Sequence, residues 1–332
     1  MKRLILIDGS NYFFRGAWAG NLTANGVSVK YTYSFFRSIV NTIKQFERDG
    51  YDCDFVVCWD GGYSERLRIS QEAVDSGLIN KAYKQERRDA RNYATEEQVK
   101  DKEEFLRQLD ETKKILTATR IGQYFIRGEE ADDLVGSFAK KYRDSYDDVV
   151  LISSDKDYYQ LLDDNVRIWN LYKKQFLSKD FLKEQYNLDS ASQWVDVGAL
   201  AGESGSGSDT IFGVPGISYK TGSKLIAEHG SLENMLSFAK KHFADLLDEY
   251  GSADKIQEAI DSGAVKLKER KKEFKVLLYE QVVNLAYELK KIRDWLDVEL
   301  PVPNPNWKEL ECYFNELHFR FSSDSFGLFL SK

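Results

Sequence analysis

Short apolar runs alternate with longer amphipathic segments along the first half of the chain. Five of these runs are rich in Val, Ile, Leu or aromatic residues and lie at 3–8, 54–59, 122–126, 148–153 and 166–169. Runs of this length and composition are typical of buried strands. The segment 31–48 places Phe35, Ile39 and Ile43 on one face, as a helix that covers a sheet would. Strands separated by helices predict an α/β fold with a doubly wound, mainly parallel sheet.

The remaining segments are expected to be mostly helical. Residues 63–120 are strongly charged and show apolar periodicity only near Phe105, Leu109 and Leu116, which predicts exposed helices that project from the core. After about residue 190 the pattern changes to helices and tight turns. Residues 202–208 are expected to form a small, polar and flexible segment, and 213–217 a hairpin. Two peripheral helical stretches are expected at 252–284 and 307–319, with an extended linker at 301–305.

The composition fits a globular protein of about two domains. The chain has 332 residues, of which 42% are hydrophobic and 30% charged, and no run is long enough to cross a bilayer. The N-terminus enters a strand without a signal-peptide pattern. Cys53, Cys58 and Cys312 form no CxxC pair, so we expect reduced, buried cysteines in a cytoplasmic protein. Three scattered histidines do not favour zinc, so any metal is expected to be held by oxygen, as Mg²⁺ or Mn²⁺ is.

Acidic residues follow the apolar runs at the points where strands should end. The acids at strand ends are Asp8, Asp60, Asp155 and Asp157. A further acidic cluster opens the helix before the fourth run and consists of Glu130, Asp132 and Asp133. Each one alone is also explained as a turn residue, a helix cap or a partner of a helix dipole. Because ligand sites of open α/β sheets lie at the carboxyl ends of the strands, we expect these side chains to converge. Converging carboxylates repel one another unless they hold hard cations, so the sequence predicts a divalent metal site.

The net charge of −7 argues at first against a nucleic-acid partner. Nine carboxylates are assigned to metal in this section, and without them 47 basic residues face 45 acidic ones. Basic residues also gather at 81–91 and 266–275, although a solvated helix face explains such a run equally well. The turn 213–217 and the lysines of 220–224 form a phosphate cradle at a helix start, or a plain turn between helices.

The chain resembles the 5′-nuclease family, which includes phage flap endonucleases, phage RNase H and the 5′-nuclease domain of bacterial DNA polymerase I. The matching stretches are LILIDGSN (4–11), VVCWDGG (56–62), AYKQERR (82–88), GEEADDLV (128–135), LISSDKDYYQLL (151–162) and GVPGISYKTGSKLIAEHGSLENML (213–236). They cover nearly the whole chain in order. The resemblance implies a PIN-like nuclease core over 1–190 with a helical arch at 63–120. It also implies a helix-three-turn-helix DNA-binding region over 191–332.

In that family the acidic residues hold two or more Mg²⁺ ions, which Mn²⁺ can replace, and we expect a monovalent cation at the hairpin. The resemblance extends the metal role of the seven acids named above to Glu203 and Asp209. The family normally has two Asp residues three apart here, whereas Glu203 and Asp209 are six apart, with 204–208 between them. Thr210 stands where the family usually has Asn, and Ser218 where it usually has Gly. These departures concern the second metal site and the phosphate cradle.

The resemblance also implies contacts to nucleic acid. Lys84 corresponds to a lysine that contacts the scissile phosphate, and either Arg87 or Arg88 to a nearby arginine. Tyr83 either stacks on an unpaired base as an exposed ring or packs within the protein. The residues expected to grip duplex backbone are Gly213, Gly216, Ser218, Lys220, Thr221 and Lys224. Two metal ions would activate water and stabilise the leaving oxygen, and Lys84 and Arg87 would add positive charge at the phosphate.

The expected protein is a monomeric, structure-specific 5′-nuclease, acting as a 5′-3′ exonuclease and flap endonuclease on DNA in replication or repair. One alternative is the removal of RNA primers from RNA–DNA hybrids, which backbone recognition also permits. A second is a PIN-type ribonuclease for single-stranded RNA, against which the arch and the hairpin argue. A third is a non-catalytic DNA-binding relative, against which the seven retained acids argue.

Overall fold

The computed structural model describes residues 1–48, 50–203 and 209–330. Packing divides the chain into two compact units, each built from separate stretches of sequence. The first unit comprises Met1–Tyr63, Tyr93–Ser178 and Ile292–Lys332. The second comprises Ser64–Asn92 and Lys179–Lys291. The boundary near residue 190 between a nuclease core and a DNA-binding region stays a prediction, because it concerns function as well as packing.

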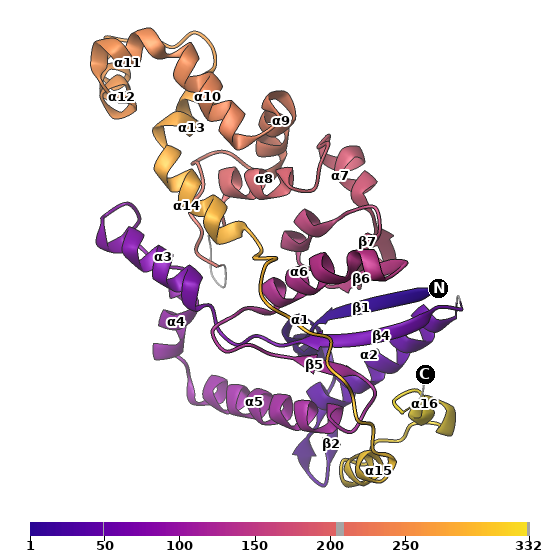
Figure 1. The fold of residues 1–332 in the computed structure, drawn as a ribbon. Helices are drawn as coiled ribbons and strands as arrows, with labels where there is room; N and C mark the ends of the chain where they lie inside the picture. The colour runs from indigo at the N-terminus through magenta and orange to yellow at the C-terminus, as the bar shows by residue number, and fades with distance from the viewer. Residues whose placement is uncertain (49, 204–208, 331–332) are drawn as a thin grey trace. The chain divides into compact units, whose positions relative to one another are not determined.

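A six-stranded sheet forms the centre of the first unit (Figure 1). In spatial order its strands are β5 (Gly122–Tyr124), β4 (Asp52–Cys58), β1 (Lys2–Asp8), β6 (Asp148–Ile152), β7 (Val166–Asn170) and β8 (Gln175–Leu177). The first five pair in parallel, and β8 runs antiparallel to β7. The five parallel strands confirm the mainly parallel α/β sheet. The sequence did not indicate β8, because three residues are too few to show a periodic pattern.

Helices and two short strands surround this sheet. They are α1 (Gly9–Phe14), η1 (Arg15–Trp18), β2 (Thr23–Ala24), β3 (Val27–Ser28), α2 (Lys30–Glu47), α5 (Glu96–Leu116), α6 (Ala131–Tyr142), η2 (Arg143–Ser145), η3 (Lys156–Leu161), α15 (Trp307–Glu316) and α16 (Ser323–Gly327). The helix predicted at 31–48 is confirmed as α2. The long helix α5 begins with a capping box between Thr95 and Gln98, and its last turn buries Ile115 and Leu116 in the core.

The C-terminal helix α15 belongs to the main hydrophobic core, so the expectation that 307–319 is peripheral was wrong. Leu310 and Phe314 are fully or almost fully buried. The ring of Phe314 lies 5.4 Å from that of Phe36 on α2 and 5.7 Å from that of Phe329, in edge-to-face geometry. The spacing of Leu310 and Phe314 shows one apolar face, but it does not show what that face covers.

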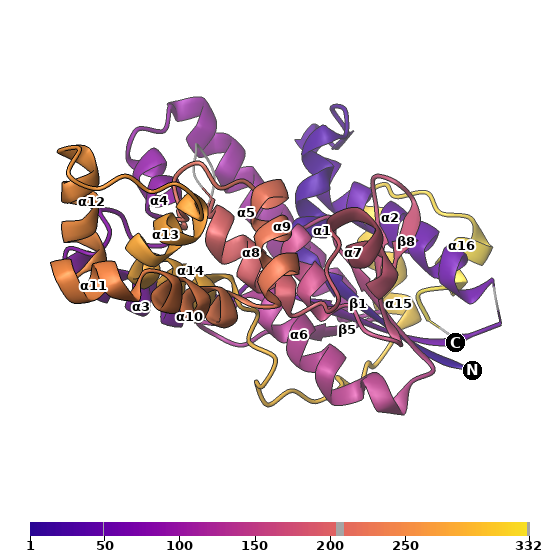
Figure 2. The same ribbon diagram turned by 90° about the horizontal axis from the view of Figure 1, so that it is seen from above.

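The second unit is helical (Figure 2). Its helices are α3 (Ser64–Asp75), α4 (Gln85–Asn92), α7 (Lys179–Tyr186), α8 (Gln193–Ala201), α9 (Tyr219–His229), α10 (Leu232–His242), α11 (Ala244–Tyr250), α12 (Ala253–Asp261), α13 (Lys271–Leu278) and α14 (Glu280–Lys290). Helix α8 packs against α9 and α14. A small hydrophobic core within this unit joins α10, α12 and α13 through Ala239, Ile256 and Phe274. The helices expected after residue 190 are thereby confirmed.

Two further expectations can be compared with the structure. No helix in the described part of the chain is long and apolar enough to cross a membrane. Cys53 and Cys58 are free and buried on β4, as expected. Cys312 is free but exposed, so the expectation of burial was wrong for this residue, which lies on the outer side of α15.

Candidate active site

Acidic residues follow three neighbouring strands of the first unit. Asp8 is the last residue of β1 and pairs in register with Cys58, two residues before Asp60. On the other side of β1, Ile7 pairs with Ile152 of β6, three residues before Asp155. The parallel register therefore brings the ends of β4, β1 and β6 to the same edge of the sheet. This placement is the one that the apolar pattern predicted.

Asp8 lies at the centre of this edge. Its Oδ1 accepts a hydrogen bond from the backbone N–H of Asn11 (2.9 Å) and caps α1, and its Oδ2 accepts one from the Tyr158 hydroxyl (3.1 Å). Burial, together with the negative charges of Asp60, Asp155 and Asp132, raises the pKa of the Asp8 carboxyl to about 8, against the lowering effect of the hydrogen bond from Asn11. The raised pKa indicates that these carboxylates are close enough to repel one another.

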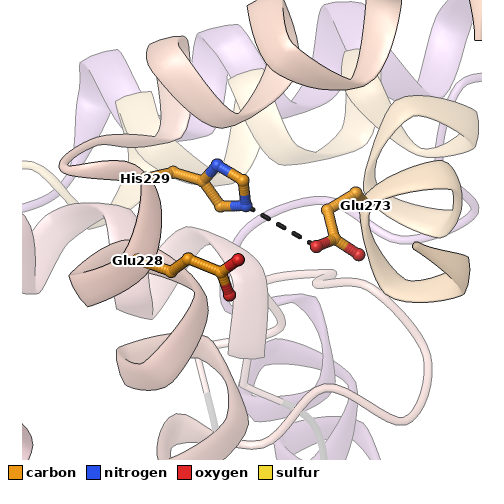
Figure 3. A group of neighbouring side chains, drawn as sticks. All are labelled: Glu228, His229 and Glu273. Atoms are coloured by element: carbon orange, nitrogen blue, oxygen red, sulfur yellow. Dashed lines mark ion pairs between the residues drawn. The ribbon is translucent and has the colours of Figure 1, made fainter. Parts of the chain in front are cut away.

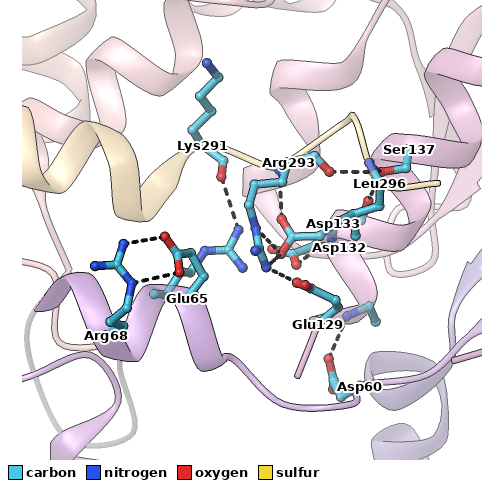
Figure 4. A network of polar contacts seen from close by, with 12 residues as sticks. Asp60, Glu65, Arg68, Glu129, Asp132, Asp133, Ser137, Lys291, Arg293 and Leu296 are labelled. Carbon is cyan, nitrogen blue, oxygen red and sulfur yellow. Dashed lines mark hydrogen bonds and ion pairs between the residues drawn. The ribbon is translucent and has the colours of Figure 1, made fainter. Parts of the chain in front are cut away.

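The start of α6 supplies a second acidic group. Asp60 Oδ1 accepts a hydrogen bond from the backbone N–H of Ala131 (2.9 Å), which ties the end of β4 to this helix start (Figure 4). Glu130, Asp132 and Asp133 each present a carboxylate oxygen, and these oxygens lie within 4.8 Å of one another. A set of clustered carboxylate oxygens suits a hard divalent cation such as Mg²⁺ or Mn²⁺. The residues present therefore fit the metal that the sequence predicts.

Asp133 is also held by an arginine that the sequence analysis missed. Arg293 lies after α14, and its Nη2 contacts Asp133 Oδ2 at 2.6 Å, while its backbone N–H donates to Asp133 Oδ1 (2.8 Å). The same guanidinium forms an ion pair with Glu129 (Figure 4). Asp133 is completely buried, so its charge needs such a partner. No sequence signal links these residues, because 160 positions separate them.

Asp155 and Asp157 lie in the loop and 3-10 helix after β6. Asp155 Oδ1 accepts a hydrogen bond from the backbone N–H of Asp157 (2.9 Å), so Asp155 caps η3. Asp155 is thus a helix cap, and its position at the acidic edge is also compatible with a role in the site. Tyr158, which binds Asp8, follows directly, and burial together with the charges of Asp8, Asp132 and Asp155 raises its pKa.

The second unit holds the remaining predicted acids and cations. Asp209 Oδ1 lies 2.7 Å from Arg87 Nη2 and 3.9 Å from Lys84 Nζ. The backbone N–H of Lys84 donates to the Asp209 carbonyl (2.8 Å), and Lys84 adopts a left-handed backbone with φ +54°. The Tyr83 hydroxyl donates to Asp209 Oδ2 (3.2 Å). The structure thus gathers three residues of the 82–88 stretch around one predicted metal ligand.

Tyr83 is 3% exposed, so the expectation of an exposed ring was wrong. Its backbone N–H donates to the Ser70 hydroxyl (2.9 Å), and its carbonyl accepts from Arg88 Nη1 (2.7 Å). The alternative reading, that Tyr83 packs within the protein, is the one that the structure supports. Arg88 is occupied with this carbonyl, whereas Arg87 reaches Asp209.

Glu203 and Asp209 flank the segment 204–208, which was expected to be flexible and lies outside the described residues. Glu203 forms an ion pair with Lys290 of α14, a lysine that is 3% exposed. Backbone hydrogen bonds in both directions join Glu203 to Ile211. This bridge fixes the two ends of the inserted segment.

The hairpin 213–217 lies in the connection between α8 and α9, two residues before α9 begins. A Cβ at Gly213 would lie 2.4 Å from the Gly202 nitrogen, so only glycine fits there. Gly216 has φ +77°, and a Cβ on it would lie 3.9 Å from Lys275 Nζ, a lysine that the sequence analysis did not select. Ser218 caps α9 by accepting a hydrogen bond from the Thr221 N–H (3.4 Å). Lys220 and Lys224 are exposed on α9.

A comparison with protein-family models decides the family. Residues 3–187 match the model described as the N-terminal, resolvase-like domain of 5′-3′ exonucleases, which is more than half of the chain. The chain belongs to the 5′-3′ exonuclease family. The seven predicted metal ligands of the first unit, from Asp8 to Asp157, all lie within the matched range.

Individual relatives of this family agree. The chain is 29% identical over 331 residues to the thermostable DNA polymerase I of Thermus thermophilus. The matched region is 98% of this chain and 33% of that protein. It is 31% identical over 193 residues to a 5′-3′ exonuclease of Buchnera aphidicola, covering 57% of each chain. A flap endonuclease Xni of Tolumonas auensis is 42% identical over 108 residues, which is 32% of this chain and 40% of that one. The chain thus spans about a third of the length of the polymerases that it matches.

Solved structures show the same fold. The 5′-exonuclease of bacteriophage T5, determined with bound zinc, superposes with a TM-score of 0.65 at 21% identity over 98% of this chain and 96% of that one. The catalytic core of Rad2 in complex with DNA gives a TM-score of 0.53 at 14% identity, over 98% and 90%. The fold of this 5′-3′ exonuclease family member is therefore the PIN-like, resolvase-like nuclease fold.

Among the residues that the structure describes, a second group also has metal-ligand chemistry. Glu228, His229 and Glu273 of the second unit place potential ligand atoms within 4.8 Å of one another, and His229 Nε2 lies 3.6 Å from Glu273 (Figure 3). Arg270 Nη1, however, contacts Glu228 at 2.5 Å and Glu273 at 2.9 Å. Burial raises the pKa of Glu273, but the bond and charge of Arg270 outweigh it and lower the pKa overall. Arg270 pairs with both carboxylates of this group, so we assign it a structural role.

Proposed function

We propose that the protein is a 5′-nuclease that hydrolyses phosphodiester bonds at DNA 5′ ends and 5′ flaps, with divalent metal ions as cofactors. The observation that carries this proposal is the convergence of Asp8, Asp60 and Asp155 at the ends of three neighbouring strands, beside the acidic start of α6. The family membership supports the same activity. The T5 relative has been crystallised with DNA and metal ions, which supports these ligands for this chain.

The proposed ligands of the metal ions are seven acidic residues of the first unit: Asp8, Asp60, Glu130, Asp132, Asp133, Asp155 and Asp157. Bound ions would polarise the phosphate, lower the pKa of a bound water and stabilise the leaving oxygen. Oxygen-only donors favour Mg²⁺ or Mn²⁺, and two or more ions would divide the acids between them. Within the protein, Tyr158 orients Asp8 through its hydroxyl, and Arg293 orients Asp133. Glu203 and Asp209 belong to the second unit, and their part in metal binding stays a prediction.

Positive side chains of the second unit are proposed to bind the substrate. Lys84 and Arg87 would neutralise the scissile phosphate as charge-assisted donors. Both side chains also form ion pairs with Asp209, so a bound phosphate would compete with this carboxylate for them. The hairpin residues Gly213 and Gly216, with the exposed lysines of α9, would contact duplex backbone without reading sequence. A monovalent cation at this hairpin is part of the proposal.

The deciding experiment is cleavage of a labelled 5′-flap duplex by the wild-type protein and by Asp155→Asn. We expect cleavage in Mg²⁺, none in chelator, and a loss of at least about a hundredfold for Asp155→Asn, with DNA binding largely retained. Wild-type rates for this variant would refute the assignment. A matching RNA–DNA hybrid in the same assay tests primer removal, and a single-stranded RNA tests the ribonuclease alternative. We expect a cytoplasmic, monomeric enzyme, and sedimentation tests the second point.

A further inference from the structure

A cavity of about 410 Å³ opens beside the predicted metal site, entirely within the first unit. It lies between the ends of β4 and β5 and the last turns of α5. The side chains that matter for its chemistry are those of Trp59, Lys113, Lys114, Gln123 and Phe125. Its volume lies in the lower part of the range of about 300–1,000 Å³ that small-molecule pockets occupy.

Hydrogen bonds and ring stacking hold the floor of the cavity in place. Trp59 is 2% exposed, stacks on Phe35 with centroids 5.8 Å apart, and donates from Nε1 to Gln123 Oε1 (2.9 Å). Gln123 Nε2 in turn donates to the carbonyl of Lys113 (2.9 Å). The side-chain amide of Gln123 therefore links the ends of both strands to α5. A floor ordered in this way lowers the cost of ordering side chains when a ligand binds.

The rim of the cavity carries a large exposed ring next to positive charge. Phe125 is 54% exposed. Lys113 Nζ lies 5.1 Å from the Trp59 ring centroid and 5.8 Å from that of Phe125. Burial lowers the pKa of Lys113, and the nearby carboxylates of Asp110 and Asp60 oppose this effect. Lys114, on the same turn of α5, is exposed.

The cavity is continuous with the acidic edge of the sheet. Trp59 directly precedes Asp60, and Asp60 also acts on the charge of Lys113. On the other side, a Cβ at Gly61 would lie 3.1 Å from the Phe125 ring and 1.9 Å from the Ile126 carbonyl oxygen. The ring therefore stands against the turn that carries Asp60. A ligand in the cavity would therefore lie beside the turn that carries Asp60.

We propose that this cavity binds one unpaired nucleotide of the substrate strand, with its base on the Phe125 ring and its phosphate at Lys113. An exposed ring accepts any base by stacking, and a lysine accepts phosphate as a point charge, so the site would be indifferent to sequence. The inference rests on the proposed nuclease function and adds a binding site to it.

The test compares flap binding by Phe125→Ala and by the matched control Tyr172→Ala. Tyr172 is another exposed ring of the first unit, 69% exposed, in the turn between β7 and β8. Fluorescence anisotropy without divalent metal measures affinity for a 5′-flap duplex with a thymidine flap, and for the same duplex with an abasic flap. We expect Phe125→Ala to weaken binding of the thymidine flap about tenfold, and Tyr172→Ala not to change it. Phe125→Trp should preserve the affinity.

The abasic flap separates stacking from other effects. If Phe125 stacks on a base, wild type should lose about tenfold when the flap is abasic, and Phe125→Ala should lose little more. Moving one abasic position along the flap should locate a single sensitive nucleotide. Equal losses for both flaps, or wild-type affinity in Phe125→Ala, would overturn the inference. Thermal unfolding of Phe125→Ala shows whether a loss reflects folding, and Lys113→Met provides a second, independent variant.

Failure of this inference is distinguishable from failure of the proposed function. If wild type does not cleave the flap in Mg²⁺, or Asp155→Asn cleaves it normally, the nuclease proposal fails. If cleavage and its loss in Asp155→Asn are as expected, but Phe125→Ala binds the thymidine flap as wild type does, only the nucleotide site fails.

Discussion

Arg293 holds Asp133 by three hydrogen bonds, two from its guanidinium (2.6 and 3.1 Å) and one from its backbone N–H (2.8 Å). Asp133 is completely buried at the start of α6, and Arg293 follows α14 in the sequence. The segment after α14 is thereby fastened to the acidic edge of the sheet. The Ser137 hydroxyl adds a second fastening, because it donates to the Arg293 carbonyl (3.1 Å) and accepts from the Leu296 N–H (3.1 Å). Figure 4 shows this network. It also shows Arg68 of the second unit, which donates two hydrogen bonds to the Glu65 carboxylate.

We expect Arg293→Met to destabilise the protein by about 3–5 kcal/mol, because it leaves the Asp133 carboxylate buried without its cation. Denaturant unfolding in chelator measures this change. The double variant Arg293→Met with Asp133→Asn should recover most of the loss, since no uncompensated charge remains. Lys140→Met, which removes an exposed ion pair with Asp294, is the matched control and should cost less than about 1 kcal/mol. A loss in Arg293→Met that the second substitution does not recover would contradict the pairing.

We expect Asp8 to make metal binding depend on pH. Burial and neighbouring carboxylates raise the pKa of its carboxyl to about 8, so at neutral pH it is largely protonated and must lose its proton to bind a cation. Mn²⁺ affinity should therefore rise with pH up to about 8, by at most about tenfold per unit, and then level off. Calorimetric titration in buffers of different ionisation enthalpy measures the released proton. Asp8→Asn should bind more weakly and release fewer protons, whereas the exposed control Asp180→Asn should behave as wild type.

We expect Lys84→Ala to slow the chemical step by about a hundredfold and to weaken DNA binding much less, because a donor aimed at developing charge acts mainly on the transition state. Single-turnover cleavage beside an anisotropy titration separates the two effects. Lys173→Ala, an exposed lysine of the first unit, is the control. An effect of Lys84→Ala on affinity that equals or exceeds its effect on rate would assign Lys84 to binding alone.

We expect Asp196 to reduce stability at neutral pH. It is 8% exposed on α8, and burial raises its pKa from 3.8 to about 6, despite the hydrogen bond from the Leu232 backbone, which lowers it. The folded state therefore holds a proton that the unfolded state has lost between these two values, so stability falls as pH rises from about 4 to 6 and stays low above that. The penalty is at most about 3 kcal/mol. Asp196→Asn should remove it.

Urea unfolding at pH 4 and pH 8 measures this effect. Asp196→Asn should match wild type at the lower pH and exceed it by about 1–3 kcal/mol at the higher one. Asp180→Asn, which changes an exposed carboxyl, should show no such difference. Equal stabilities of Asp196→Asn and wild type at both pH values would show that the folded-state pKa is not raised.

The sequence alone determined the parallel sheet and the acidic edge of the first unit. Apolar runs of strand length ended at Asp8, Asp60 and Asp155, and the parallel register can place the ends of neighbouring strands only at one edge. Local patterns of this kind are written in consecutive residues, so composition and periodicity suffice to read them. The resemblance to 5′-nucleases then followed from the order of the motifs.

Only the tertiary structure decided which side chains meet across long separations. Arg293 with Asp133, Lys290 with Glu203 and the aromatic face of α15 against Phe36 left no periodic signal. The burial of Tyr83 was equally hidden, because a tyrosine in a charged stretch fits both an exposed and a buried ring. The physical reason is that a partner's identity depends on how helices pack, and packing is fixed by the sum of many weak contacts spread over the chain.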